Sequence, residues 1–83
     1  MKLTVRYFAS IREALGAGET LDAADGLTVG EVRDLLIAKG GAHAVALARH
    51  RALRSALNQV LCDEAAHVSD GAELAFFPPV TGG

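Results

Sequence analysis

The segment KLTVRYF, residues 2–8, alternates apolar and polar side chains, with Leu3, Val5 and Tyr7 on one side. A period of two is typical of a β-strand that buries only one face. Phe8 falls on the side of the polar residues, so it adds an aromatic group to the face turned away from the core. We therefore predict a half-buried first strand with one outward aromatic side chain.

The segment that follows predicts a hairpin interrupted by a helical turn. Ser10 and Glu13 have the spacing of a capping box, which indicates a short helical turn that ends near Gly16. Residues 19–23 then predict a second, weaker strand.

The main helix is predicted after a turn at residues 25–26. Thr28 and Glu31 have the spacing of a second capping box. Apolar residues then recur at helical spacing, namely Val29, Val32, Leu35 and Leu36. Gly40 and Gly41 close this segment, and the alanine-rich residues 42–52 predict a further helix.

Two more strands complete the predicted fold, at residues 57–62 and 73–77, and Pro78-Pro79 ends the last one. This order of elements favours an α+β fold in which one mixed sheet packs against the main helix. If the first and last strands are neighbours, they pair in parallel at the centre of the sheet. We expect one domain at residues 1–77 and a flexible C-terminal tail at residues 78–83.

Size and composition limit the possible functions. The 83 residues, of which 51% are hydrophobic and 22% charged, fit one small globular domain. Such a domain has little room for a deep active site, which favours chemistry supplied by partners. The single cysteine excludes an intramolecular disulfide, and neither a secretory signal nor a membrane-spanning run is evident. We expect a cytoplasmic protein with no membrane association.

Charge is divided unevenly along the chain. All eight Lys and Arg residues lie at or before Arg54, whereas four acids follow it. The lack of a basic cluster argues against nucleic-acid binding. The acidic C-terminal region fits steering toward a basic partner surface, and it fits an ordinary solvated face equally well.

The last six residues, PPVTGG (78–83), have no role in a packed core. The prolines favour an extended path, and six extended residues reach roughly 20 Å. Gly82 and Gly83 have no side chains, so the tip is narrow enough for a channel in a partner. This pattern indicates a carboxylate presented on a thin probe, which activation as an acyl-adenylate and attack by sulfur would convert to a thiocarboxylate. The simpler interpretation is a frayed terminus without a function.

The ending FFPPVTGG (76–83) resembles that of the small subunit of molybdopterin synthase. The stretch YFASIRE (7–13) is similar to the start of that family, and ALNQ (56–59) is similar to an internal segment. The resemblance spans nearly the whole chain and is weakest at residues 40–54. It implies a ubiquitin-like β-grasp fold, in agreement with the order of elements.

The resemblance also implies a sulfur carrier. Gly83 would be adenylated by an ATP-dependent activating enzyme, and a sulfur-donating system would convert it to a thiocarboxylate. The large subunit, in a heterotetramer, would then pass the sulfur to cyclic pyranopterin monophosphate in molybdenum cofactor biosynthesis. Catalytic residues other than Gly83 would belong mainly to the large subunit, and no stably bound cofactor or metal is implied. The tail residues that would insert into that subunit are Pro79, Val80, Thr81 and Gly82.

Three apolar residues are candidates for the partner interface. Phe76 and Phe77 are adjacent on a strand, so only one of them faces the core, and Leu74 shares the parity of Phe76. We therefore predict an outward patch of Phe8, Leu61 and Phe77, the positions at which the family resemblance implies partner contacts. The alternative is that helices cover both faces of the sheet.

The remaining candidates are interpreted as structural. Cys62 is a small core residue rather than a sulfur relay. The three histidines show no metal-ligand spacing. Two other functions stay open: a β-grasp carrier or protein modifier of another pathway, such as thiamine synthesis or another thiolation, and a non-catalytic interaction module with an inert tail.

Overall fold

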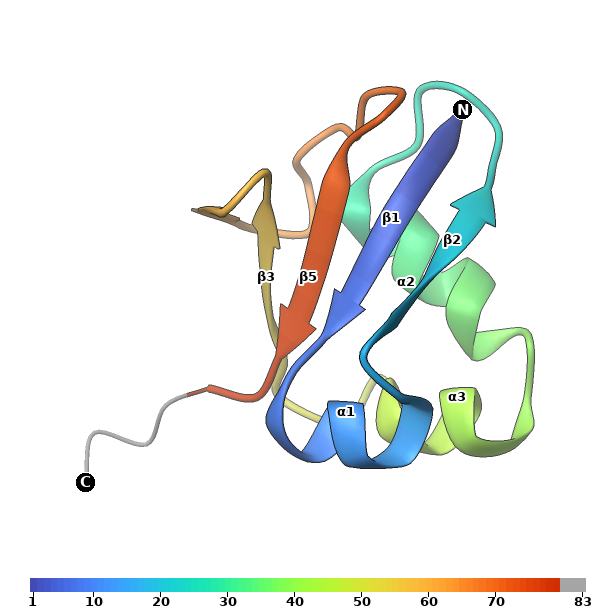
Figure 1. Cartoon of the computed structure of the whole chain (residues 1–83), viewed down its shortest axis with the longest axis vertical. Coiled ribbons are helices and arrows are strands. Elements are labelled where there is room, and N and C mark those ends of the chain that lie inside the picture. Colours follow the sequence, from blue (N-terminus) through green and yellow to red (C-terminus); the bar gives the residue numbers. More distant parts are fainter. Residues whose placement is uncertain (80–83) are drawn as a thin grey trace.

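The computed structural model describes residues 1–79 of the chain (Figure 1). Within that range lie five strands and three helices. The strands are β1 (Lys2–Tyr7), β2 (Gly18–Asp22), β3 (Arg54–Leu57), β4 (Val60–Cys62) and β5 (Glu73–Phe77). The helices are α1 (Ala9–Leu15), α2 (Val29–Ile37) and α3 (Gly41–Ala46). None of these helices is long and apolar enough to cross a membrane.

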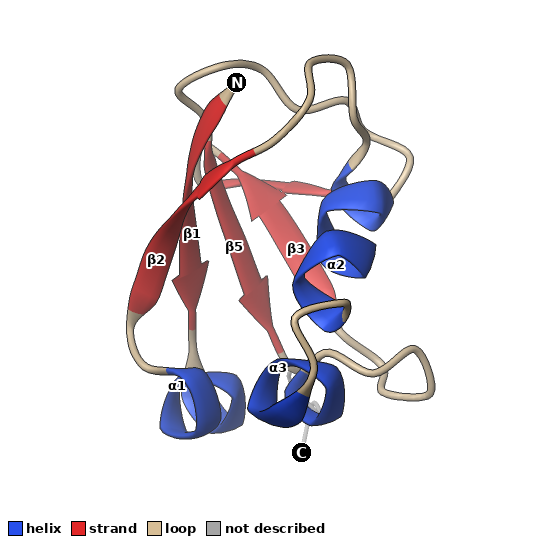
Figure 2. Cartoon of the chain, turned by 90° about the vertical axis from the view of Figure 1, so that its right-hand side faces the viewer, coloured by secondary structure: helices blue, strands red, loops and turns tan. Residues whose placement is uncertain are grey.

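The strands form one mixed sheet in the order β2-β1-β5-β3-β4. β1 and β5 pair in parallel, with Val5 opposite Leu74, and the other neighbours pair antiparallel. The predicted central pairing of the first and last strands is therefore confirmed. Figure 2 shows α2 against one face of the sheet, and α1 and α3 at the end where β1 and β5 finish.

The hydrophobic core lies between the sheet and α2. Leu74 and Phe76 of β5 are at most 1% exposed, as their shared parity predicts. The inward residues of β1 and of α2 are equally buried, namely Leu3, Val5, Tyr7, Val29, Val32 and Leu36. Leu35 was expected on the same helix face, but it is exposed because it lies to one side of the buried stripe.

Only one of the two predicted capping boxes forms. The Thr28 hydroxyl accepts from the Glu31 N–H at 3.2 Å, and the Glu31 carboxylate accepts from the Thr28 N–H at 3.0 Å. The capping box predicted at Ser10 is wrong, because α1 already begins at Ala9. Phe8 is the residue before this helix, and its N–H donates to the Phe76 carbonyl. This bond keeps Phe8 next to β5, so the helix begins two residues earlier than predicted.

The single strand predicted at residues 57–62 is a hairpin instead. β3 and β4 are joined by Asn58 and Gln59, which have φ angles of 48° and 69°. Two successive positive φ values match the tight turn whose twist suits a two-residue hairpin. Asn58 is held in place by two bonds to the backbone of Glu73: its N–H donates to the carbonyl, and its side-chain oxygen accepts from the N–H.

A polar cluster around Glu19 fastens the α2–α3 connection to the β1–β2 hairpin. The Glu19 carboxylate accepts from the Tyr7 hydroxyl at 2.7 Å and from Lys39 Nζ at 2.5 Å, and it contacts His43 Nε2 at 2.7 Å. Burial alone would raise the pKa of Glu19, but the bonds from Lys39, His43 and Tyr7 outweigh it and lower the pKa to about 2. Burial and the neighbouring carboxylate raise the pKa of Tyr7.

This cluster predicts an acid-dependent loss of stability. Since the pKa of Glu19 falls from its usual 4.5 to about 2 on folding, its contribution is complete above 4.5 and is lost as the pH falls through about 2. Glu19→Gln should therefore lower the urea midpoint at neutral pH, and the difference from the wild type should shrink in acid. Glu13→Gln on exposed α1 is the control. An unchanged difference across this pH range would contradict the assignment.

Candidate functional site

The candidate site begins where β5 ends. Four of the predicted tail residues, Val80, Thr81, Gly82 and Gly83, lie outside the described residues. The segment Phe77–Pro79, which we call the tail base, is half-buried. Because β5 lies between β1 and β3, the chain leaves the domain from the middle of the sheet and not from an edge.

The face of the sheet opposite α2 carries an apolar surface next to the tail base. The strand register places Ala75 opposite Ala56, and Ala56 opposite Leu61. Phe77 lies two residues beyond Ala75 on the same face. The predicted patch residues Phe8, Leu61 and Phe77 therefore share this face, and we call them, with Ala56 and Ala75, the outer patch.

The outer patch is open to solvent at its two ends. Phe8 is 39% exposed and Leu61 is 68% exposed. The helices of residues 1–79 leave this face uncovered, because α2 packs on the opposite one (Figure 2). The alternative that helices cover both faces of the sheet is therefore wrong for the described part of the chain. Large exposed apolar side chains that gather on one face are typical of a binding surface.

A groove of about 430 Å³ lies beside the tail base and is lined by Pro79, by the first two residues of β3 and by the end of β4. Cys62 lines it in part, packs against the core, and has its Sγ 3.8 Å from the Ser55 hydroxyl. This environment suits the interpretation of Cys62 as a small core residue. Within residues 1–79, no group of three His, Cys, Asp or Glu side chains is placed to hold a metal ion.

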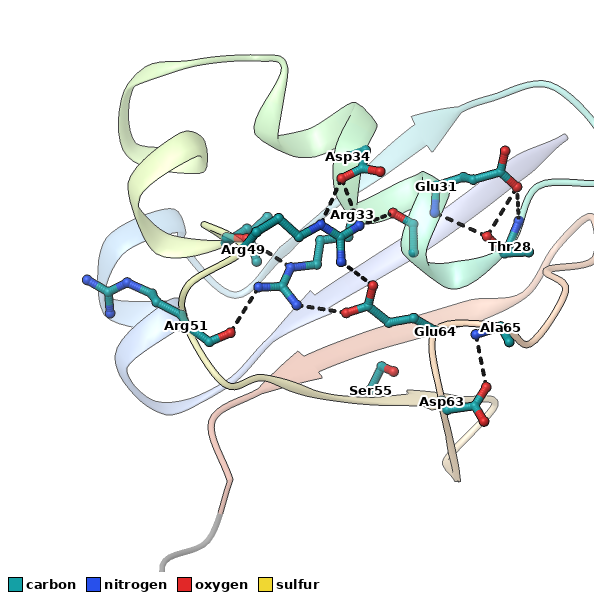
Figure 3. Close-up of polar contacts among 12 residues, drawn as sticks. Thr28, Glu31, Arg33, Asp34, Arg49, Arg51, Ser55, Asp63, Glu64 and Ala65 are labelled. Atoms are coloured by element: carbon teal, nitrogen blue, oxygen red, sulfur yellow. Dashed lines mark hydrogen bonds and ion pairs between the residues drawn. The ribbon is translucent and has the colours of Figure 1, made fainter.

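Arg33 is almost fully buried, binds Glu64 at the border of the groove, and donates to three carbonyl groups. Figure 3 shows its guanidinium between Glu64 and the backbone of Arg51. Its Nε donates to the Leu47 carbonyl at 2.8 Å, and its Nη2 donates to the carbonyls of Ala48 and Arg51. Its Nη1 lies 2.8 Å from the Glu64 carboxylate. This side chain therefore satisfies the backbone of the segment between α3 and β3, which explains why the helix predicted at 42–52 ends at Ala46.

Arg49 approaches the same carboxylate from the other side. It forms an ion pair with Glu64, another with Asp34 at 2.7 Å, and a hydrogen bond to the Gly30 carbonyl (Figure 3). Burial would raise the pKa of Glu64, but its bonds to Arg49 and Arg33 lower it, and the bonds to Glu64 and Asp34 raise the pKa of Arg49. We call Arg33, Arg49, Asp34 and Glu64 the arginine network.

The arginine network attaches the segment between α3 and β3 and the turn after β4 to α2. A Cβ on Gly30 would lie 2.9 Å from the Glu64 carboxylate, so glycine lets that turn approach the helix closely. Sequence reasoning missed this network. The available signal was Arg33 itself, because a charged residue four positions after Val29 falls on the apolar stripe of the helix.

The model of the ThiS family matches residues 5–83. The chain belongs to the ThiS family. This ThiS-family chain is also 42% identical over 81 residues to the molybdopterin synthase sulfur carrier subunit of Escherichia coli, covering 98% of the chain and 99% of the relative. The resemblance inferred from the ending, from residues 7–13 and from residues 56–59 is thereby confirmed.

Solved structures confirm the fold of this ThiS-family member. The crystal structure of SAMP1 from Haloferax volcanii matches all of both chains with a TM-score of 0.79 and 26% identity. The small chain in a complex of subunits 1 and 2 of the molybdopterin-converting factor from Helicobacter pylori matches over the full length of both chains, with a TM-score of 0.69 and 26% identity. The predicted ubiquitin-like β-grasp is correct.

Removing Arg33 should destabilise this ThiS-family domain strongly. Arg33→Met would leave three carbonyls without their side-chain donor and remove one of the two arginines that bind the Glu64 carboxylate, which is expected to cost about 3 kcal/mol. Urea unfolding gives the free energy directly. Arg12→Met, on the exposed side of α1, should change it by less than about 0.5 kcal/mol. Equal effects of the two substitutions would refute the role assigned to Arg33.

Proposed function

We propose that this chain is the sulfur carrier subunit of a molybdopterin synthase, with the carboxylate of Gly83 as its working group. The observation that carries the proposal is the 42% identity over 98% of the chain to carriers of this kind. The fold supports it, since the tail is attached to the central strand β5, which is hydrogen-bonded to a neighbour on both sides. The same identity favours this assignment over the two alternatives, a thiamine-type carrier and an inert interaction module.

The proposed chemistry takes place at the carbonyl carbon of Gly83. A carboxylate is a poor electrophile, so an activating enzyme first transfers AMP from ATP to it and releases pyrophosphate. A sulfur nucleophile from a donor system then displaces AMP, and a thiocarboxylate remains on Gly83. Once the sulfur is bonded to the pterin precursor, cyclic pyranopterin monophosphate, water hydrolyses the bond between this sulfur and the Gly83 carbonyl carbon, so the sulfur stays on the pterin and the carboxylate is restored. A terminal Gly-Gly suits each step because no side chain crowds the carbonyl.

The proposal assigns the catalytic residues of the transfer mainly to a large subunit. Pro79, Val80, Thr81 and Gly82 would enter that subunit, while the outer patch would rest on its surface. The relative from Helicobacter pylori was solved as a complex of its two subunits, which supports a pairing of this kind. We further propose a heterotetramer, with two copies of each subunit, that acts in the cytoplasm.

Intact mass tests the carrier chemistry. After incubation with the activating enzyme, ATP and a sulfur source, the chain should gain one sulfur in place of one oxygen. A variant that ends at Thr81 should gain none and should not support molybdopterin formation with the large subunit. Sulfur incorporation into the truncated variant, or no mass change in the full chain with active enzymes, would overturn the proposal.

A pair of neighbouring substitutions tests the outer patch. Leu61 and Val60 are both 68% exposed, but the register places Val60 with Leu57 on the opposite face from the patch. Leu61→Asp should weaken binding to the large subunit by about 30-fold, as expected when a charge replaces a large apolar side chain that an interface buries. Val60→Asp should bind like the wild type, and Phe77→Asp should behave like Leu61→Asp.

Calorimetry measures these affinities, and circular dichroism checks that each variant folds. Equal losses in Leu61→Asp and Val60→Asp would show that the effect is one of strand β4 as a whole. The outer patch would then not be the binding surface.

A further inference from the structure

The outer patch is bordered by arginines, although the residues that follow Arg54 in the sequence carry only acidic charges. Arg54 of β3 lies directly opposite Phe77, and Arg6 of β1 lies opposite Ala75. Phe77 therefore sits on the central strand with one arginine position on each of the two flanking strands. We call Arg6 and Arg54 the arginine pair. It stands beside the tail base although the chain as a whole carries a net charge of −2.

The arginine pair is available to a partner. Arg54 is exposed and forms no ion pair within residues 1–79. Arg6 is 44% exposed, and its only acidic contact in that range is a long one to Glu73, at 3.8 Å. Its guanidinium carbon lies 5.9 Å from the centre of the Phe8 ring, which holds this arginine beside the patch.

The acids nearest to Arg54 have other partners. Asp63 follows β4 on the side next to Arg54, but its carboxylate accepts from the Ala65 N–H at 2.9 Å within its own turn. Glu64 is bound by Arg33 and Arg49 in the arginine network. The charge of Arg54 is thus not neutralised by a described neighbour.

We propose that the arginine pair faces carboxylates on the subunit that receives the tail, so that the partner surface is an apolar hollow bordered by acids. This inference rests on the proposed function, because it names the chemistry of the same partner. Complementary charges at the border of an interface speed association and fix orientation, whereas the apolar centre provides most of the affinity. The accessible charge beside the tail base is therefore positive, whereas the C-terminal part of the sequence is acidic.

Charge substitutions at Arg54 test the inference with the large subunit of molybdopterin synthase as the binding probe. Arg54→Glu should lower the association rate constant by about tenfold at low salt. The difference should largely disappear in about 1 M salt, where the screening length is only about 3 Å. Arg54→Lys should bind like the wild type, and Arg54→Gln should fall between the two.

Lys2→Glu is the matched control. It makes the same change of charge on the same outward side of β1, four residues from Arg6 and roughly 13 Å away. Its association rate constant should change much less than that of Arg54→Glu. Urea midpoints of all variants confirm that they remain folded.

The outcomes separate the two proposals. If the wild type does not bind the large subunit, the proposed function fails. If the wild type binds and Leu61→Asp weakens binding, but Arg54→Glu associates as fast or faster, only the acidic border is refuted. A loss in Arg54→Glu that persists undiminished in high salt would also refute it, because steric effects are not screened.

Discussion

The parallel pairing of β1 with β5 is the constraint from which the candidate site follows. It brings residues near the two ends of the chain together at the centre of the sheet, with Val5 opposite Leu74 and Tyr7 opposite Phe76. Because β5 is flanked by β1 on one side and by β3 on the other, the strand that carries the tail base is hydrogen-bonded to a neighbour on both sides. The same pairing places Phe8 beside the end of β5, so the outer patch and the tail base form one continuous surface.

The elements that depend on local sequence could be predicted well. The alternation in β1, the capping box at Thr28 and the prolines after β5 act over a few residues, and their consequences are visible in the sequence. Two of the failures have non-local causes. The box at Ser10 is overridden by the bond between Phe8 and the Phe76 carbonyl, and the length of α3 is limited by Arg33. The turn at Asn58-Gln59 escaped notice because it contains no glycine.

The candidate site was predictable for a simple geometric reason. Two adjacent apolar residues on a strand cannot both face one core, which identifies Phe77 as outward without knowledge of the register. What could not be predicted is the surroundings of that residue. Arg54 and Arg6 are 48 positions apart in the sequence, and only the order of strands β1, β5 and β3 shows that they border the same outer patch. The sequence therefore indicated an acidic C-terminal region, whereas the folded surface beside the outer patch carries two arginines.

The central position of β5 also has a mechanical consequence. In the proposed function the tail is withdrawn from its partner after each transfer, and a pull along the axis of β5 would act directly on the strand to which the tail is joined. β5 is bonded to a neighbour on both sides, so this force loads two rows of hydrogen bonds in shear and all at once, instead of peeling them apart one by one. The domain therefore resists force most strongly at β5, the strand through which the tail would be pulled.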